Sequence, residues 1–303
     1  PTAVVRPEET PQSGMEQETG QSGSGAGQEE QENPGAWFEM SGDIVGLVLL
    51  GIDSNEVREE QNMGYRSDSI AVCAINVVDN TCTLITVPRD TRVKIRKLDK
   101  NGEVVTSRYD KINAAFAYGG GPDKFGHENA LYALSNLLGV DLQYYASLNM
   151  DAIIPLTEAV GGVPVTLEQD MKGIGKAGET VVLHGETAYQ FVRRRKGITG
   201  GSDVARTARQ RDYLKGLAMR VKEMGAVAAV PSLLGALGNN ARTNLSMEQM
   251  LALATVLSRM EDNALKMQCI PGRSKTIDGA SYYISDPEGT RALARQAFGG
   301  AGG

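Results

Sequence analysis

The sequence predicts an α/β protein with three layers, α/β/α, in which helices flank a central mixed β-sheet. The first observation is a continuous apolar run at residues 45–50, typical of a strand that is buried on both faces. The second is the alternation of strand-like and helical segments, with no internal repeat, which favours a layered α/β domain. The third is size, because 303 residues with 41% hydrophobic side chains are enough to form a large core.

The elements follow in order along the chain. The apolar run reaches Asp53 at its carboxyl end, where open α/β sheets bind ligands. Residues 69–77 and 81–87 predict two antiparallel strands around an Asp79-Asn80 turn. Further strands are predicted at 104–107, 144–149, 163–167, 179–183, 266–270 and 281–284, and helices at 125–138, 151–160, 185–192, 203–224, 246–260 and 287–298.

Charge divides the chain into unequal parts. Residues 1–36 hold seven glutamates and one arginine, and the remaining residues balance to zero within a net charge of −6. We therefore predict a disordered acidic Gly/Ser/Glu-rich linker at 1–41, one catalytic domain at 42–298, and a flexible Gly-rich end at 299–303. A linker of this kind suggests a membrane anchor upstream. The acidic balance argues against nucleic acid as a partner, and no apolar run approaches the length of a membrane-spanning helix.

Cysteine and histidine are scarce. Three cysteines without metal-ligand spacing predict neither a zinc site nor a disulfide framework, so we expect three small core residues. The hairpin turn is expected to place Cys82 opposite Val77, too far from Cys73 for a cross-strand disulfide. His127 and His184 are expected at the surface or at the start of a helix, and a Ser–His catalytic pair is not indicated.

Arginine beside aspartate recurs in five polar clusters. Alternation along a strand places Arg66 and Asp68 on one face, and antiparallel pairing brings Arg89 beside them. Helical offsets of three, four and seven place the last cluster on one helix face. The clusters are Asp53; Arg66 with Asp68; Arg89, Asp90 and Arg92; Arg193, Arg194 and Arg195; and Asp203, Arg206, Thr207 and Gln210.

These residue types point to phosphoryl transfer. Arginine forks match phosphate oxygens, and paired aspartates suit Mg²⁺, which binds through carboxylates together with substrate phosphates. The three glycines at 119–121 lack the Lys-Ser/Thr of a P-loop. Each cluster alone also has a structural explanation: an ordinary salt bridge, a solvated arginine face, or an N-cap in the case of Asp203.

Taken in order, the motifs resemble those of the LytR-CpsA-Psr family of bacterial cell-envelope proteins. The similarity covers about residues 44–225 and continues weakly to the end. The matching stretches are LLGID at 49–53, RSDS at 66–69, VPRDT at 87–91, KINAAFAYGG at 111–120, VGGV at 160–163, LHGETA at 183–188, VRRR at 192–195 and DVARTARQ at 203–210.

The resemblance implies a Mg²⁺-dependent phosphotransferase that moves a glycopolymer, such as teichoic acid or a capsule-like polysaccharide, from a polyprenyl-pyrophosphate carrier onto peptidoglycan. Pyrophosphatase activity is an expected side reaction. Family members carry one N-terminal membrane helix and a catalytic domain outside the cell membrane, which is the localisation we expect here. Helices at 125–138, 151–160 and 213–224 either line a tunnel for the lipid or are plain core.

The site residues follow from the clusters and the resemblance. Asp53 and Asp68 are the expected metal ligands. The expected catalytic residues are Arg66, Asp203 and Asp90, with either aspartate as the acceptor of the proton. The expected substrate-binding residues are Arg66, Arg89, Arg92, Arg193, Arg195, Arg206 and Gln210.

Two other functions compete with this one. A non-catalytic polyprenyl-phosphate-binding regulator of the cell envelope would need the arginines but not the acidic pair. A DNA-binding transcription factor ranks last, because the sequence has neither a helix-turn-helix signature nor a basic face.

Overall fold

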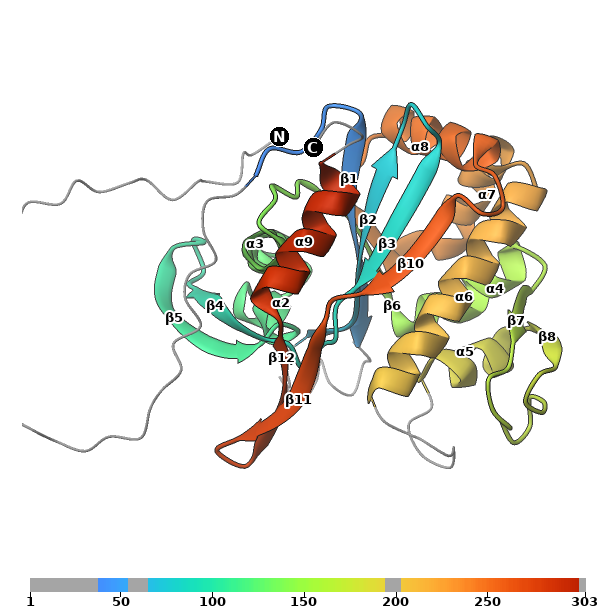
Figure 1. Ribbon diagram of the computed structural model, residues 1–303. Coiled ribbons are helices and arrows are strands. Elements are labelled where there is room, and N and C mark those ends of the chain that lie inside the picture. Colours follow the sequence, from blue (N-terminus) through green and yellow to red (C-terminus); the bar gives the residue numbers. More distant parts are fainter. Residues whose placement is uncertain (1–37, 54–64, 194–202, 300–303) are drawn as a thin grey trace, which may run out of the picture.

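The computed structural model describes residues 38–53, 65–193 and 203–299, with the side chains of 203–205 left out. Its centre is a six-stranded sheet of order β10-β3-β2-β1-β6-β9 (Figure 1). β1 pairs antiparallel with β2 and parallel with β6, so the predicted mixed sheet is confirmed. Its strands are β1 (Ile44–Asp53), β2 (Arg66–Asn76), β3 (Thr81–Thr86), β6 (Tyr144–Asn149), β9 (Ala241–Thr243) and β10 (Leu265–Cys269).

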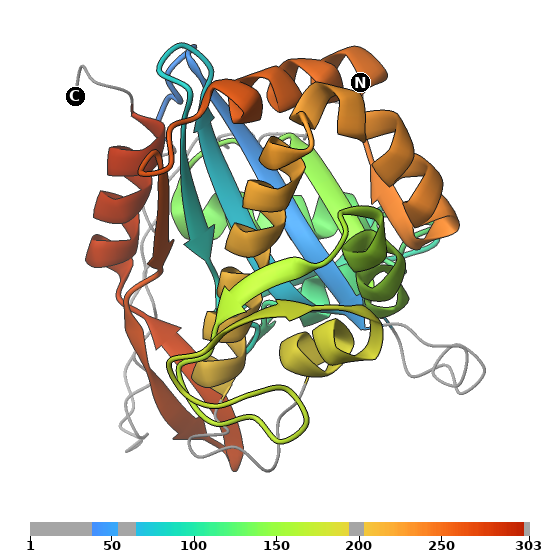
Figure 2. The ribbon, with the colours of Figure 1, turned by 90° about the vertical axis from the view of Figure 1, so that its right-hand side faces the viewer.

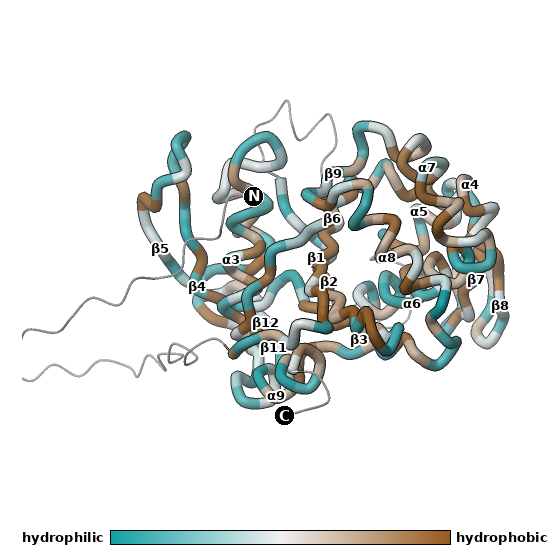
Figure 3. Tube along the Cα trace, turned by 90° about the horizontal axis from the view of Figure 1, so that it is seen from above, coloured by the Kyte–Doolittle hydropathy of each residue, from teal (hydrophilic) through white to brown (hydrophobic). Residues whose placement is uncertain are grey.

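Helices cover both faces of the sheet, which confirms the three layers (Figure 1). Val48 and Leu50 of β1 face one core with α2 (Ala114–Tyr118), α3 (Gly126–Leu138) and α9 (Pro287–Phe298). The alternate residues Leu47 and Leu49 face α6 (Asp203–Glu223) and α8 (Met247–Arg259). Figure 2 shows α6 crossing in front of the strands, and Figure 3 shows hydrophobic segments along them.

A third cluster of apolar side chains includes Tyr213, Leu217 and Val221 of α6. It joins α4 (Ile153–Ala159) and α5 (Gly185–Arg193) to the hairpin of β7 (Val163–Thr166) and β8 (Thr180–Leu183). α7 (Ala226–Leu237) packs at its rim, and the short 3₁₀ turns η1 (Met150–Ala152) and η2 (Gly238–Asn240) lie nearby in the chain. Of the three helices considered for a lipid tunnel, α3 therefore belongs to a different apolar cluster from α4 and α6.

Two further hairpins lie outside the central sheet, β4–β5 to its left and β11–β12 below it in Figure 1. β4 (Arg92–Leu98) pairs with β5 (Val104–Lys111), and β11 (Gly272–Ile277) pairs with β12 (Ala280–Ser285). A bridge between Thr91 and Tyr283 brings the two hairpins together. The sequence predicted β5 and β12 but not their partner strands, nor α2, α7 and β9.

The β2–β3 turn corrects the predicted register. Cys82 lies opposite Ile75 rather than Val77, because the turn takes four residues after Asn76, whose Oδ1 accepts hydrogen bonds from two turn amides. Cys73 and Cys82 therefore lie diagonally on one face of the sheet, both buried as free thiols. Cys269 is exposed, which corrects the expectation that it is a core residue.

Other predictions fall at the edges of the described chain. The predicted linker at 1–41 lies almost entirely outside the described residues, as does most of the Gly-rich end. In the described part, no single helix is long and apolar enough to cross a membrane. α6 and the helical stretch after it pass that test of length and composition only as a pair, bent by 119° at the break between them.

Candidate functional site

The site is built on an irregularity where β1 ends and β2 begins. Gly51 pairs with Ser69, but Ile52 pairs with Ser67, so Asp68 is an extra residue in β2. Such a bulge takes a residue out of the ladder and redirects its polar groups. The backbone oxygen of Asp68 accepts a hydrogen bond from Arg206 Nη2, 3.3 Å away. The alternation that predicted Arg66 and Asp68 on one face is interrupted here.

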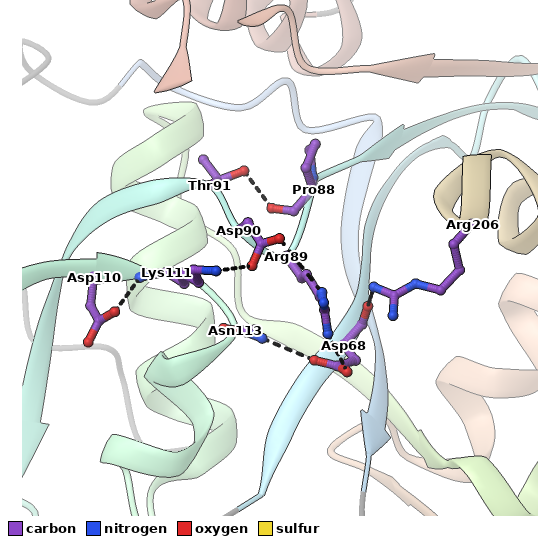
Figure 4. A network of polar contacts seen from close by, with 9 residues as sticks. All are labelled: Asp68, Pro88, Arg89, Asp90, Thr91, Asp110, Lys111, Asn113 and Arg206. Atoms are coloured by element: carbon purple, nitrogen blue, oxygen red, sulfur yellow. Dashed lines mark hydrogen bonds and ion pairs between the residues drawn. The ribbon is translucent and has the colours of Figure 1, made fainter. Parts of the chain in front are cut away.

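The carboxylate of Asp68 is held from two sides (Figure 4). Its Oδ2 accepts from Arg89 Nη1 at 2.8 Å, and its Oδ1 accepts from Asn113 Nδ2 at 3.0 Å. The side chains of Asp68 and Arg89 are only 10% and 19% exposed, so the ion pair is shielded from water. The predicted neighbourhood of Asp68 and Arg89 is confirmed.

Asn113 ties three segments of the site together. Its backbone amide donates to Arg89 O at 3.2 Å, and its backbone oxygen accepts from the Ser67 amide at 3.4 Å. The residue is buried, and its Oδ1 has no hydrogen-bond partner among the described residues. The sequence marked Asn113 only as part of a family motif, and the structure adds it to the site.

Asp90 lies one residue beyond Arg89, at the edge of this network. Its Oδ1 is 2.8 Å from Lys111 Nζ, and its Oδ2 is 3.9 Å from Arg89 Nε. The loop that presents both residues is fixed by Thr91, whose hydroxyl donates to Pro88 O at 2.5 Å. Asp90, proposed as a proton acceptor, is thus the partner of Lys111, a second residue that the sequence did not single out.

Arg66 and Asp53 face each other at the end of the β1–β2 ladder. Arg66 is exposed and has no carboxylate partner among the described residues. Near it, burial and the adjacent Asp110 carboxylate raise the pKa of Tyr118, while the charges of Arg108 and Arg66 oppose that shift. Burial also disfavours ionised Asp110, but hydrogen bonds from Arg108, the Lys111 amide and Tyr118 outweigh it and lower the pKa of that carboxyl.

The first turns of α6 contribute buried polar side chains. Arg206, Arg209 and Gln210 are all less than 9% exposed. Arg209 Nε donates to Phe191 O at 3.0 Å and so joins α6 to the end of α5, an interaction that the sequence did not indicate. In the predicted cluster at the start of α6, Arg206 thus contacts Asp68, and Gln210 is buried one helical turn further along the helix.

The arginines after α5 are only partly described. Arg193 is exposed at the end of the helix and donates to the Tyr189 hydroxyl, and within the described part of the chain it does not reach Asp68. Arg194 and Arg195 lie outside the described residues. Asp203 begins α6, but its side chain is not among those described. Arg92 stacks on Tyr109, with its guanidinium carbon 4.5 Å from the ring centre, in the β4–β5 hairpin.

The residues can be tested against magnesium. Among the described residues, no three His, Cys, Asp or Glu side chains gather as a ready-made metal site. Magnesium often needs only one or two carboxylates, with waters and substrate phosphates completing its shell. Asp68 offers two carboxylate oxygens, and the buried Oδ1 of Asn113, which has no hydrogen-bond partner among the described residues, is a further oxygen donor. The donor set therefore fits a magnesium ion shared with a phosphate substrate.

A second polar cluster, which the sequence did not predict, lies between α3 and β6. His127 Nε2 is 2.8 Å from Ser147 Oγ, and the imidazole stacks on Tyr145 with ring centres 4.0 Å apart. Burial and the charge of Arg242 lower the pKa of His127 to about 4. Both His127 and Ser147 are less than 5% exposed, so this Ser–His pair is enclosed in the fold. His127 lies at the start of α3, as expected, but it is not at the surface.

Comparison with known proteins places the chain among cell-wall enzymes. A teichoic acid transferase of Bacillus anthracis, "Polyisoprenyl-teichoic acid--peptidoglycan teichoic acid transferase TagU", is 32% identical over 242 residues, covering 79% of this chain and 73% of that protein. B. subtilis TagV has a similar crystal structure, with a TM-score of 0.68 and 23% identity over 86% of this chain and 99% of that one. A structure of TagT bound to LI-WTA gives a TM-score of 0.65 and 22% identity, with coverages of 85% and 92%.

The family assignment rests on the whole length of the fold. The residues that match the family run from 14 to 297, and they include the strands, the bulge and the α6 arginines described above. The chain belongs to the LytR_cpsA_psr family.

Proposed function

We propose that this protein is a Mg²⁺-dependent glycopolymer phosphotransferase that moves a wall polymer from a polyprenyl-pyrophosphate carrier onto peptidoglycan. The observation that carries the proposal is the convergence of Arg89 and Arg206 on Asp68, with the exposed Arg66 beside them. Relatives named as teichoic acid transferases, and a structure of the same fold bound to LI-WTA, support this substrate class.

The arginines would bind and orient the pyrophosphate. Guanidinium groups stay charged at any relevant pH and match phosphate oxygens in bidentate geometry. Arg66 has no carboxylate partner among the described residues, so its charge is available to an incoming phosphate. Arg89 is held in place by Asp68, which fixes its orientation before substrate arrives.

The reaction is a displacement at phosphorus. A sugar hydroxyl of peptidoglycan attacks the phosphorus that carries the glycopolymer, forming a new P–O bond. The bond to the bridging oxygen breaks, and polyprenyl phosphate leaves with its electron pair. The hydroxyl proton passes to a carboxylate, for which Asp90 and Asp203 are the candidates. Water in place of the sugar would give pyrophosphate cleavage as a side reaction. Cations aimed at the developing charge stabilise this type of transition state.

Asp53 and Asp68 would hold the magnesium ion, with Asn113 Oδ1 as a further oxygen donor. When bound, the metal supplies positive charge to the phosphate oxygens. The bulge at Asp68 supports this assignment, because it takes a carboxylate-bearing residue out of the ladder at the end of β1.

We also propose that the domain works on the outer side of the cell membrane, held by a single membrane helix before residue 1. The acidic composition of residues 1–36 and the family resemblance support this arrangement. It places the site between a lipid carrier in the membrane and the peptidoglycan above it.

The proposal is tested by turnover of a short-chain polyprenyl-pyrophosphate donor with a peptidoglycan fragment as acceptor. Arg66→Ala should lower turnover by about 100-fold, the scale reported for one lost transition-state contact. The free energy of unfolding of the Arg66→Ala variant should stay within about 0.5 kcal/mol of the parent value, because the Arg66 side chain is exposed and has no carboxylate partner among the described residues. The matched control is Arg295→Ala, an exposed arginine on α9. Equal turnover of the Arg66 variant and the control would refute the assignment.

Chelation separates the enzyme from a carrier-binding regulator. With EDTA, turnover should stop and then return on addition of Mg²⁺, while binding of polyprenyl phosphate measured by fluorescence falls less. A protein that binds the carrier equally well with and without chelator, and shows no turnover in Mg²⁺, would instead be the non-catalytic alternative.

A further inference from the structure

The β4–β5 hairpin is strongly basic in an acidic protein. Residues 92–111 contain seven lysine and arginine side chains and three acidic ones, a local charge of +4 against −6 for the whole chain. The neighbouring β11–β12 hairpin adds Arg273 and Lys275 against Asp278. A concentration of one charge sign on a single surface attracts ligands of the opposite sign.

The hairpin sorts its charges by face. Alternate residues of a strand point to opposite faces. Val93 and Ile95 are buried against the helices, so Arg92 and Lys94 lie on the other face of β4. Their partners across the ladder are Lys111 and Tyr109 on β5. We call Arg92, Lys94, Tyr109 and Lys111 the outer face of the hairpin; Arg96, which follows in the same alternation, is instead half-buried and stacks on Tyr132 of α3.

The outer face holds more cations than the described residues neutralise. Arg92 lies directly opposite Lys111, an arrangement of like charges that destabilises a β-ladder. Lys111 is compensated by Asp90, but Arg92 has only the ring of Tyr109, and Lys94 is exposed with no carboxylate partner in the described chain. A bound anion would offset this repulsion.

Continuity with the candidate site is direct. Lys111 bonds Asp90, which lies 3.9 Å from Arg89 Nε, and Arg89 bonds Asp68 (Figure 4). On the other side, Lys111 Nζ is 5.7 Å from the ring centre of Tyr282 in β12. A ligand polymer that extends from the proposed phosphate site toward the hairpin would pass alternating cations and tyrosine rings.

We propose that the outer face of the β4–β5 hairpin binds the phosphodiester-linked glycopolymer of the donor, beyond the pyrophosphate at which the reaction occurs. The proposal rests on the function proposed above. Phosphodiester groups carry one negative charge per linkage, which suits Arg92 and Lys94, and tyrosine rings offer apolar faces to sugars. The acceptor glycan is the competing occupant, but its charges are carboxylates on flexible peptides rather than a regular series along the polymer.

The experiment uses a fluorescent poly(glycerol phosphate) oligomer without lipid, so that binding does not depend on turnover. Lys94→Glu should weaken its binding by roughly ten-fold at low salt, because an attractive contact becomes a repulsive one. Lys97→Glu is the matched control: the same strand and charge change, but on the face shared by Val93 and Ile95. It should weaken binding less than about two-fold. The difference should shrink as salt is raised.

The outcomes separate the two proposals. With donors of increasing polymer length, Lys94→Glu should raise KM for the long donor and leave a donor with a single phosphosugar unchanged. Equal effects of Lys94→Glu and Lys97→Glu on oligomer binding would overturn the hairpin assignment while leaving the proposed reaction intact. Loss of binding to a soluble peptidoglycan fragment, with oligomer binding preserved, would overturn it in favour of the acceptor. Failure of the parent protein to turn over any donor would contradict the proposed reaction alone.

Discussion

Two polar clusters lie on either side of β1 in the central sheet, one at Asp68 of β2 and one at Ser147 of β6, and they differ in what surrounds their polar groups. Around His127 the polar atoms satisfy each other: the imidazole bonds Ser147, stacks on Tyr145 and is excluded from water. Around Asp68 a carboxylate fixes one arginine, while Arg66 nearby is exposed and without a carboxylate partner in the described chain.

This difference in burial and charge separates the structural His127 cluster from the Asp68 cluster, which we propose to be reactive. Burial of His127 lowers its pKa and removes its charge, so the cluster is an uncharged part of the core. The Asp68 cluster keeps its charges because arginine does not lose its proton in proteins. The Ser–His hydrogen bond is therefore explained as part of the core, whereas the arginines around the bulge form the proposed active site.

The largest effect is expected at Asp68. Asp68→Ala removes the partner of Arg89 and leaves a shielded cation, which should cost about 3 kcal/mol of unfolding free energy. Turnover should fall by at least about 100-fold. Urea denaturation and the donor assay measure the two effects.

Asp68→Asn is the matched variant, because it retains an oxygen that accepts from Arg89 but loses the charge. It should recover most of the stability and little of the turnover. Recovery of both would mean that the Asp68 carboxylate charge has no part in the reaction.

The next effect concerns pH. The pKa of His127 is about 4 in the folded protein and about 6.5 when unfolded, so between these values the unfolded state binds more protons. Stability should therefore fall as pH drops from 6.5 to 4, by about 3 kcal/mol in total. Denaturant unfolding at a series of pH values measures it.

His127→Phe keeps a stacking ring and cannot be protonated, so it should flatten this part of the pH profile. Turnover at neutral pH should be nearly unchanged. A large loss of turnover in a stably folded His127→Phe variant would contradict a purely structural role for the His127 cluster.

The smallest effect is expected at Asn113. Asn113→Ala removes the Nδ2 bond to Asp68 but keeps both backbone bonds, so stability should fall by only about 1–2 kcal/mol. Turnover should fall by about ten-fold, because the Asp68 carboxylate loses the hydrogen bond from Asn113 that helps to orient it. Asn113→Asp, which places a second carboxylate against Asp68, should be worse than alanine in both assays; an aspartate variant as active as the parent would contradict this role.

Much of the fold could be predicted from local patterns. The apolar run of β1, the Gly139 end of α3 and the Ser246 cap of α8 each carry a signal within a few residues. β4 was not predicted, although Val93 and Ile95 alternate with the basic residues of that segment. α7 has no polar periodicity and contains Pro231, so its helix was not recognised.

The structure brings some residues of the predicted site together, but most of the geometry of this candidate site was not predicted. The arginines and aspartates were identified, and the antiparallel hairpin correctly placed Asp68 beside Arg89. Asn113 was not identified, because its bond to Asp68 joins residues 45 positions apart and no local pattern encodes it. The bulge was likewise hidden, since one extra residue in a ladder leaves no mark in the sequence.

That extra residue makes the site depend on chain length as well as on side-chain identity. Side chains in a strand change face with every step, so removing one residue near position 68 would restore a regular ladder and shift the rest of the strand by one. The Asp68 carbonyl, which now accepts a hydrogen bond from Arg206, would instead be directed toward a neighbouring strand of the sheet. A substitution can change the side chains at this end of the sheet. The bulge itself, from which the Asp68 carbonyl reaches Arg206, exists only because β2 has one residue more than β1 at this point.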